Sequence, residues 1–222
     1  MIRAAVFDFD GVVLESVEIK TIAFRRLFED HPEGERIVPY HMANGGISRF
    51  KKFQWFYEEV RGEALTEAES ERLGARFSAL VLDEIRRCAF VPGARELLER
   101  LAPRLPLFVA SGTPEEELRG IVADRGLGDV FAAVYGTPPT KAEILRRIMD
   151  ERGLEPGELV FVGDAMSDFK GAAAAGVPFI GRCYPGETSP FPGGTFTVLD
   201  LAELDARWGE LDASPPPVPA AR

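Results

Sequence analysis

The sequence predicts an α/β fold: a doubly wound, mainly parallel sheet with a helical cap domain inserted after the first strand. Two observations predict this fold class. Short apolar runs of the kind that form buried strands alternate with helical patterns, which indicates right-handed crossovers between parallel strands. One long helical stretch interrupts that alternation directly after the first apolar run. The 222 residues are enough for one substantial domain and a smaller second one.

Six runs rich in β-branched, aliphatic and aromatic residues are predicted to be buried strands. They are Ile2–Phe7, Leu105–Ala110, Phe131–Tyr135, Leu159–Val162, Val177–Ile180 and Thr195–Leu199. The sequence between most of them predicts helices, at Gly93–Leu101, Pro114–Arg125, Lys141–Arg152 and Phe169–Ala175. We therefore expect helices to cover both faces of the sheet.

The stretch between the first and second strands contains no good strand pattern. It predicts three helices, at Val17–Asp30, Ser48–Val60 and Glu67–Arg87. On a helical wheel the second of these separates an apolar face from a polar face, which carries Lys51 and Lys52. We expect a discontinuous core, residues 1–14 and 89–210, with residues 15–88 as the cap domain. The proline-rich residues 213–222 are predicted to be unstructured.

Composition excludes several classes of partner and site. A net charge of −10 gives no support to a nucleic-acid partner, and no apolar stretch approaches the roughly 18 residues that span a bilayer. We therefore expect a cytoplasmic protein, either a monomer or a homodimer. Cys88 and Cys183 have no CxxC spacing, and His31 and His41 have no ligand partner at helical spacing, which argues against a disulfide framework or a zinc site.

Polar residues follow several predicted strands, at the edge where ligands of parallel sheets bind. The carboxylates of that edge are Asp8, Asp10, Asp164 and Asp168. Ser111 and Gly112 follow the second strand, and Lys141 opens the helix between the third and fourth. So much acid in one cleft would be destabilising without a cation, and oxygen ligands favour Mg²⁺. Ser111, the Gly112 N–H and Lys141 would hold phosphate oxygens.

Each of these motifs has an ordinary structural explanation when it is taken alone. Asp-x-Asp-Gly could be a turn or half of a calcium loop, although Val12 and the flanking strand argue against an EF-hand. Thr113 could cap the next helix, with Pro114 in its first turn and Glu116 closing a capping box. Lys141 could be a solvated lysine. The conjunction of the motifs, in this order and at strand ends, is what favours a phosphate site.

Together the motifs resemble those of the haloacid dehalogenase-like superfamily of phosphohydrolases. The first motif is in "FDFDGVVLES", the second in "VASGT", the third at Lys141 and the fourth in "GDAMSD". "VPGARELLERL" and the helical insert after the first motif resemble the phosphoglycolate phosphatase and β-phosphoglucomutase branch, whose cap lies at that point. The resemblance covers nearly the whole predicted core.

The resemblance implies a role for each residue of the strand edge. Asp8 would attack phosphorus to form an aspartyl-phosphate, while Asp10 would act as acid and base with a pKa above that of an ordinary aspartate. Asp8, Asp164 and the backbone carbonyl of Asp10 would hold Mg²⁺. Asp168 would orient those ligands or Lys141, and Ser111 and Lys141 would hold the transferring phosphoryl group.

The cap is expected to choose the substrate. In "HMANGGISRFKK" the glycines predict a flexible turn before a helix capped by Ser48. "GISR" is similar to the cap loop of β-phosphoglucomutase-like enzymes, where the arginine meets an anionic end of the substrate. Arg49, with Lys51 or Lys52, therefore points across the cleft or simply starts a solvated helix. Among Lys20, Lys51 and Lys52, none has a setting that indicates a Schiff-base lysine.

The sequence thus predicts a Mg²⁺-dependent phosphatase that hydrolyses a small phosphorylated metabolite, a sugar phosphate or a phosphoglycolate-like compound, through an aspartyl-phosphate. Two alternatives stay open at this point. A phosphomutase of the β-phosphoglucomutase type would use the same intermediate and pass the phosphoryl group to a sugar hydroxyl. A non-catalytic binding module could keep the same fold.

Overall fold

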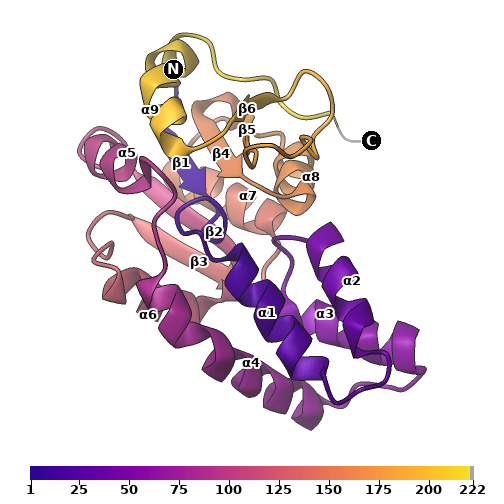
Figure 1. Cartoon of the computed structure of the whole chain (residues 1–222). Helices are drawn as coiled ribbons and strands as arrows, with labels where there is room; N and C mark the ends of the chain where they lie inside the picture. Colours follow the sequence, from indigo (N-terminus) through magenta and orange to yellow (C-terminus); the bar gives the residue numbers. More distant parts are fainter. Residues whose placement is uncertain (221–222) are drawn as a thin grey trace.

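A computed structural model describes residues 1–220 and contains one six-stranded sheet (Figure 1). The strand order is β3-β2-β1-β4-β5-β6, and every neighbouring pair is parallel. The strands are β1 (Ala4–Phe7), β2 (Leu107–Pro114), β3 (Ala133–Thr137), β4 (Leu159–Gly163), β5 (Phe179–Arg182) and β6 (Phe196–Val198). The expected doubly wound α/β fold is confirmed, and β1 lies at its centre between β2 and β4.

Helices cover both faces of the sheet, as the alternation predicted. They are α5 (Ala94–Leu101), α6 (Glu115–Asp124), α7 (Lys141–Arg152), α8 (Met166–Ala175) and α9 (Leu201–Ala213), with a 3-10 turn at Pro156–Glu158. Successive residues of β1 point to opposite faces. Ala5 and Phe7 join the cluster that includes α5, α6 and α9, whereas Ala4 and Val6 pack with α7 and α8.

The cap is a group of helices inserted after β1 (Figure 1). It contains α1 (Val17–Phe28), a 3-10 turn (Gly34–Arg36), α2 (Ile37–Ala43), α3 (Arg49–Trp55), a π-helical turn (Phe56–Arg61) and α4 (Glu67–Arg87). Its interior is a cluster of aromatic rings, among them Phe24, Phe28, Phe53, Phe56 and Phe77. The boundaries 15–88 for the cap domain stay a prediction.

Two expectations about helices were wrong. Lys52 was placed on a solvated face of α3, but it is buried because α2, which was not predicted, packs beside it. Thr113 was expected to cap α6, but β2 continues to Pro114, which is itself the N-cap residue and makes no side-chain capping bond. The Thr113 hydroxyl instead bonds to Asp10 and Lys20.

The C-terminal region also differs from the expectation. Helix α9 was not predicted, although Asp200 caps it and Leu201, Leu204, Trp208 and Leu211 recur at helical spacing and are buried. The expected tail 213–222 begins inside this helix, residues 214–220 form neither helix nor strand, and residues 221–222 lie outside the described residues. No helix of residues 1–220 is both long and apolar enough to cross a bilayer. The cytoplasmic location and the choice between monomer and homodimer stay predictions.

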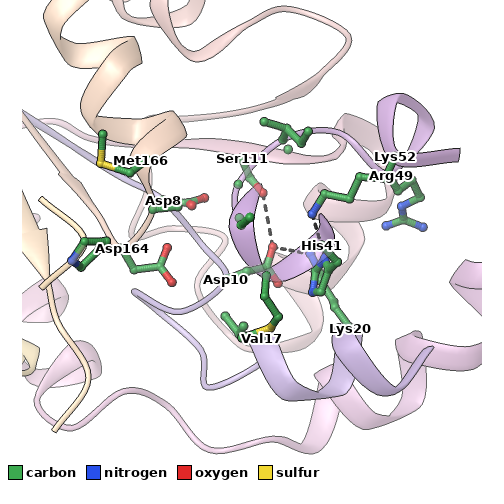
Figure 2. Close-up of a pocket in the computed structure, with 18 of the residues that line it drawn as sticks. Asp8, Asp10, Val17, Lys20, His41, Arg49, Lys52, Ser111, Asp164 and Met166 are labelled. Carbon is green, nitrogen blue, oxygen red and sulfur yellow. Dashed lines mark hydrogen bonds and ion pairs between the residues drawn. The ribbon is translucent and has the colours of Figure 1, made fainter. Parts of the chain in front are cut away.

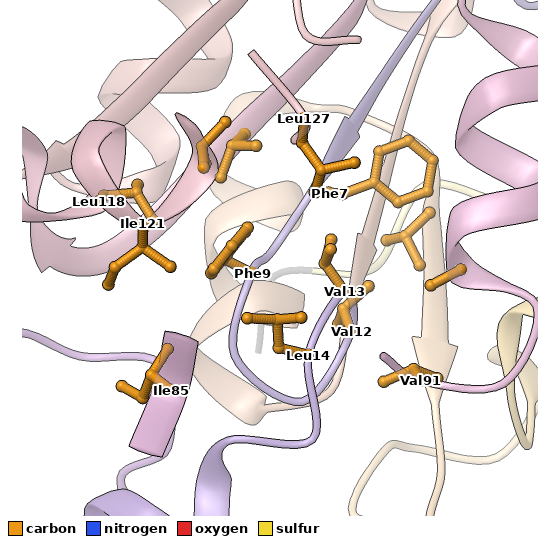
Figure 3. Packing of buried hydrophobic residues seen from close by; sticks show 14 of the residues in the cluster. Phe7, Phe9, Val12, Val13, Leu14, Ile85, Val91, Leu118, Ile121 and Leu127 are labelled. Atoms are coloured by element: carbon orange, nitrogen blue, oxygen red, sulfur yellow. The ribbon is translucent and has the colours of Figure 1, made fainter. Parts of the chain in front are cut away.

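Apolar residues of the loop after β1 pack into a continuous apolar cluster (Figure 3). Phe9, Val12, Val13 and Leu14 are fully or almost fully buried there, against residues from α4, α6 and the segment before α5. Protein interiors are close-packed, so this anchoring fixes the path of the loop. The polar residues of the loop, Asp8 and Asp10, are thereby held at the edge of the sheet.

Gly93 provides a test of how the core closes between α5 and α9. Its φ is +75°, and a β-carbon there would collide with the backbone of Ala202. Gly93→Ala should lower the free energy of unfolding by about 2 kcal/mol or more in urea titrations. As a control, Gly120→Ala in α6, which meets nothing within 4 Å, should raise it by about 0.5–1 kcal/mol. Equal effects of the two substitutions would contradict this packing.

Candidate active site

Asp8 is a buried carboxylate of the strand edge. It follows β1, its side chain is buried, and the residue as a whole is 1% exposed. Its Oδ1 accepts a hydrogen bond of 2.7 Å from the Phe9 backbone N–H, and its Oδ2 accepts one of 2.7 Å from the Lys141 ammonium. Gly11, with φ +75°, turns the loop where a β-carbon would collide with Asp164. The turn therefore needs glycine to bring Asp8 and Asp164 together.

Lys141 lies between two carboxylates. It is the first residue of α7, whose start is fixed by a capping box of Thr140 and Glu143. Its ammonium forms ion pairs with Asp8 and with Asp168. Burial alone would lower the pKa of Lys141, but Asp168 and Asp8 outweigh it and hold the pKa above its usual value. Lys141 is therefore a permanent cation at the floor of the site.

Asp8, Asp164 and Asp168 form a compact group of acids. One carboxylate oxygen from each lies within 4.8 Å of the others. Burial raises the pKa of Asp8 to about 7, with Lys141 opposing and Asp168 and Asp10 adding to the rise. Burial also raises the pKa of Asp164 to about 7, and Asp8 contributes. Both shifts have the same cause, which is negative charge buried with too little positive charge beside it.

The donor chemistry of this group fits Mg²⁺. The four acids Asp8, Asp10, Asp164 and Asp168 form ion pairs with only two ammonium groups, so full ionisation leaves two negative charges that these ion pairs do not neutralise. The ligand atoms are carboxylate oxygens, which hard divalent ions prefer. Asp8 and Asp164 line the cavity whereas Asp168 does not, and both oxygens of Asp168 hold other groups, Lys141 and the Ala165 N–H, so the acids most available to an ion are Asp8 and Asp164.

Asp10 is held by hydrogen bonds on both of its oxygens. Oδ1 accepts from the Ser16 hydroxyl at 2.6 Å, and Oδ2 accepts from Lys20 and, at 3.2 Å, from the Thr113 hydroxyl. The expectation of a raised pKa for Asp10 was wrong. Burial does raise it, but the Lys20 ammonium together with the hydrogen bonds from Ser16 and Thr113 outweighs burial and lowers the pKa below its usual value.

Lys20 is a site residue that the sequence did not single out. It comes from α1 in the cap, pairs with Asp10 and donates a 2.8 Å hydrogen bond to the Thr113 hydroxyl of β2. The spacing between Ser16 and Lys20 could have indicated it. Lys20 follows Ser16 by one helical turn, so the two residues share the helix face that begins at the Asp10 loop. The cap thus contributes a cation directly to the core's second aspartate.

Ser111 and Gly112 lie where β2 leaves its regular register with β3. The Ser111 hydroxyl accepts a 3.1 Å hydrogen bond from the Thr113 N–H and approaches Asp10 at 3.5 Å. A β-carbon on Gly112 would lie 2.5 Å from the carbonyl oxygen of Gly46, so the cap loop rests directly on this strand. The structure therefore brings the residues of the second motif to the same cavity as Asp8 and Asp10.

That cavity has a volume of about 300 Å³ and lies between the cap and the strand edge (Figure 2). Asp8, Asp164 and Met166 lie on one side of the view, and His41, Lys52 and Arg49 from the cap lie on the other. All the predicted site residues except Lys141, Asp168 and Lys51 line it directly. Lys141 and Asp168 lie just behind Asp8, where Lys141 reaches its carboxylate.

Arg49 lines the cavity, but its guanidinium already has a protein partner. It forms two hydrogen bonds of 2.6 and 3.1 Å with Glu117 of α6 and donates one of 2.9 Å to Ser78 of α4. Arg49 is 4% exposed. The side chain therefore joins α3 and α4 of the cap to α6 of the core, which is a role that the sequence pattern did not predict.

Comparison with known proteins agrees with this geometry. The family model for haloacid dehalogenase-like hydrolases matches residues 2–176. The chain belongs to this family. It is 30% identical over 212 residues to phosphoglycolate phosphatase of Rhodospirillum rubrum. This match covers 90% of this chain and 88% of that protein. It is also 30% identical over 188 residues to a 5'-nucleotidase of Pseudomonas aeruginosa, covering 80% of this chain and 81% of that protein.

Solved structures show the same fold. β-Phosphoglucomutase from Clostridium difficile superposes with a TM-score of 0.75 at 16% sequence identity, covering 96% of this chain and 100% of that chain. The resemblance to the haloacid dehalogenase-like superfamily, in its phosphoglycolate phosphatase and β-phosphoglucomutase-like branch, is thus confirmed. The chain is a haloacid dehalogenase-like phosphatase with a cap inserted after its first strand.

The raised pKa values of Asp8 and Asp164 predict a pH-dependent response to Mg²⁺. Without metal, the stability that these groups gain from holding protons is present below pH 4 and is lost as the pH rises through about 7. Saturating Mg²⁺ should therefore raise Tm by about 5 °C at pH 8 and by much less at pH 5, in thermal melts against EDTA.

One test variant and one control variant show whether the ion that causes this shift binds at Asp164. Asp164→Asn should abolish the Mg²⁺-induced shift at pH 8, whereas Asp129→Asn, at an exposed aspartate, should keep it. An equal shift at both pH values, or a full shift in Asp164→Asn, would show that the ion binds elsewhere.

The Arg49–Glu117 pair predicts a strong coupling between cap and core. Removing either partner leaves the other charge buried, so Arg49→Ala and Glu117→Ala should each cost about 3 kcal/mol of unfolding free energy. The double variant should cost little more than either single one in a double-mutant cycle. The two single variants should also change kcat/KM by similar factors. Additive losses of unfolding free energy would contradict the coupling of Arg49 with Glu117. A loss of kcat/KM confined to Arg49→Ala would make Arg49 a direct substrate ligand.

Proposed function

We propose that the protein is a Mg²⁺-dependent phosphatase that hydrolyses a small phosphorylated metabolite through an aspartyl-phosphate on Asp8. The observation that carries this proposal is the position of one buried carboxylate, Asp8, beside the Lys141 ammonium and within an acid cluster that suits a divalent ion. Ser111 and Gly112 line the same cavity. A nucleophile, an anion receptor and a metal site thus share one small space.

Asp8 and Asp164, with the backbone carbonyl of Asp10, would hold the ion. When bound, Mg²⁺ supplies positive charge that screens a phosphate dianion from the carboxylates. Asp168 would act indirectly, because its two oxygens hold Lys141 and the start of α8 in place. This arrangement leaves the Lys141 ammonium facing Asp8, where it can also bind an oxygen of the phosphoryl group.

Residues from β2 and from the start of α7 would bind the phosphoryl group. The Ser111 hydroxyl and the Gly112 N–H, which line the cavity, and the Lys141 ammonium, which contacts Asp8 from behind, would offer donors to its non-bridging oxygens. Asp8 would attack phosphorus in line with the departing oxygen, forming a P–O bond to its carboxylate as the ester P–O bond breaks. Water would then attack the same phosphorus and release phosphate, which restores Asp8.

Asp10 would handle the protons of both steps. Its lowered pKa makes it a carboxylate at neutral pH, ready to accept the proton of the attacking water. The leaving oxygen needs a proton in the first step, which the protonated form of Asp10 would supply, and Asp10 would regain that proton from the attacking water in the second step. Lys20, which is paired with Asp10, would hold that carboxyl group in place. Lys20 thus takes a positioning role in this proposal, from the cap side of the cavity.

The substrate is proposed to be small. A cavity of about 300 Å³ is at the lower end of the usual range for ligand sites. The named sequence relatives are a phosphoglycolate phosphatase and a 5'-nucleotidase. These names support hydrolysis over transfer to a sugar hydroxyl. They also support catalysis over a silent binding module.

Asp8→Asn tests the nucleophile directly. The substitution keeps the size of the side chain, so the fold should survive, but phosphate release from an aryl phosphate with Mg²⁺ should fall at least about 10³-fold. Wild-type protein quenched in acid during turnover of labelled substrate should carry a hydroxylamine-sensitive acyl-phosphate, which the variant should lack.

The matched control for that experiment is Asp129→Asn, which alters an exposed aspartate that does not line the cavity and should leave turnover unchanged. Substantial residual activity in Asp8→Asn, with a normal melting curve, would refute Asp8 as the nucleophile.

A further inference from the structure

The basic side chains that line the cavity or lie directly behind it differ in one respect, which is whether an acid neutralises them. Lys141 pairs with Asp8 and Asp168, Lys20 pairs with Asp10, and Arg49 pairs with Glu117. Among the ion pairs of residues 1–220, none includes Lys52. Lys52 lines the cavity and is only 3% exposed. It is a buried ammonium without an acidic partner, which is a costly arrangement in a folded protein.

The surroundings of Lys52 leave most of its hydrogen-bonding capacity unused. Its ammonium donates one hydrogen bond of 2.8 Å, to Nδ1 of His41, and lies 5.3 Å from the centre of the Phe24 ring. An ammonium has three N–H donors, so two have no described protein acceptor. Burial lowers the pKa of Lys52 to about 7, with the Lys20 ammonium contributing. A nearby anion would relieve both deficits.

His41 adds a second unsatisfied donor. Burial and the Lys52 ammonium lower its pKa to about 3, so the ring is neutral. Because Nδ1 accepts from Lys52, the ring proton is on Nε2, and that buried atom has no hydrogen-bond partner. Figure 2 shows Lys52 and His41 together on the cap side of the cavity, across from Asp8 and Asp164.

We propose that Lys52, held by His41, is the anion-binding residue of the cap, and that it receives a carboxylate or second phosphate on the leaving part of the substrate. The inference rests on the proposed function, because it assigns the non-reacting end of the same substrate. It differs from the resemblance-based expectation for Arg49, whose guanidinium is occupied by Glu117.

The rest of the cap wall narrows the substrate class further. Most cap side chains that line the cavity beside Lys52 are apolar: Val17, Phe24, Met42, Ile47 and Phe77. A sugar presents several hydroxyl groups, each of which needs a hydrogen-bond partner when it is buried. Such a wall offers few partners for them. A short acid, with a single anionic group to pair with Lys52, matches the wall better than a sugar phosphate does.

Three phosphate monoesters separate the possible sources of the anion. 2-Phosphoglycolate carries a carboxylate, ethanediol bisphosphate carries a second phosphate, and ethyl phosphate has the same chain length without an anion. Wild-type kcat/KM with Mg²⁺ should be about 100-fold higher for at least one of the anionic esters than for ethyl phosphate. The preferred ester of the two identifies the source.

Lys52→Met should remove that preference. The variant keeps the length of the side chain but not the charge, so kcat/KM for the preferred ester should fall about 100-fold while that for ethyl phosphate changes less than about threefold. The matched control is Lys51→Met, because Lys51 is the exposed neighbour on the same helix and should keep the preference. Removing a buried unpaired charge should leave the melting temperature of Lys52→Met equal to or above that of wild type.

A wild-type pH series gives a readout that needs no variant. The ratio of kcat/KM for the preferred ester to that for ethyl phosphate cancels groups that act on both, and should fall between pH 6 and pH 9 as Lys52 loses its proton. The groups that face Lys52 are His41 from α2, Lys20 from α1, Asp10 after β1, Lys141 from α7 and Asp164 after β4.

The outcomes distinguish a failure of the proposed phosphatase function from a failure of the assignment of Lys52. If wild-type protein hydrolyses none of the three esters, the proposed function fails. If it hydrolyses all three equally, or if Lys52→Met and Lys51→Met behave alike, the phosphatase proposal stands and the assignment of Lys52 is overturned. A Lys52→Met variant that loses activity on all three esters by the same factor would also overturn it, because that result indicates a structural role.

Discussion

The structure depends on how one sheet edge tolerates four buried or half-buried carboxylates. Like charges about 4 Å apart repel by about 4 kcal/mol even at an effective dielectric constant of 20. Lys141 relieves part of that repulsion between Asp8 and Asp168, and Lys20 relieves it at Asp10. The remaining deficit is centred on Asp8 and Asp164, whose pKa values both rise to about 7. In the proposed function a divalent cation would fill that deficit and make the edge a receptor for phosphate.

The fold divides this electrostatic task between its two parts. The core supplies the acids and Lys141 from loops that the parallel sheet brings to one edge, each fixed by a buried strand or a capped helix. The cap supplies cations: Lys20 to Asp10, Arg49 to Glu117 and Lys52 to the cavity. Movement of the cap would therefore change the charge balance of the site together with its access to water.

Sequence patterns predicted what depends on local order along the chain. The strand–helix alternation predicted the parallel sheet, and the strand-end positions predicted the convergence of Asp8, Ser111 and Asp164 on one cavity. What failed depends on contacts between helices whose packing a single sequence does not reveal. Lys52 seemed solvated because α2 was not predicted, and the pKa of Asp10 was expected to rise because its pairing with Lys20 crosses from cap to core. The neutralising cations were therefore harder to predict than the acids.

The central claim is that a divalent cation turns an acidic edge into a phosphate receptor. Calorimetric titration with inorganic phosphate, which is the product and contains no leaving group, tests this without turnover. The account predicts that phosphate binds at least tenfold more tightly with saturating Mg²⁺ than in EDTA, at pH 8 where Asp8 and Asp164 are ionised. Equal phosphate affinity with and without Mg²⁺ would contradict it.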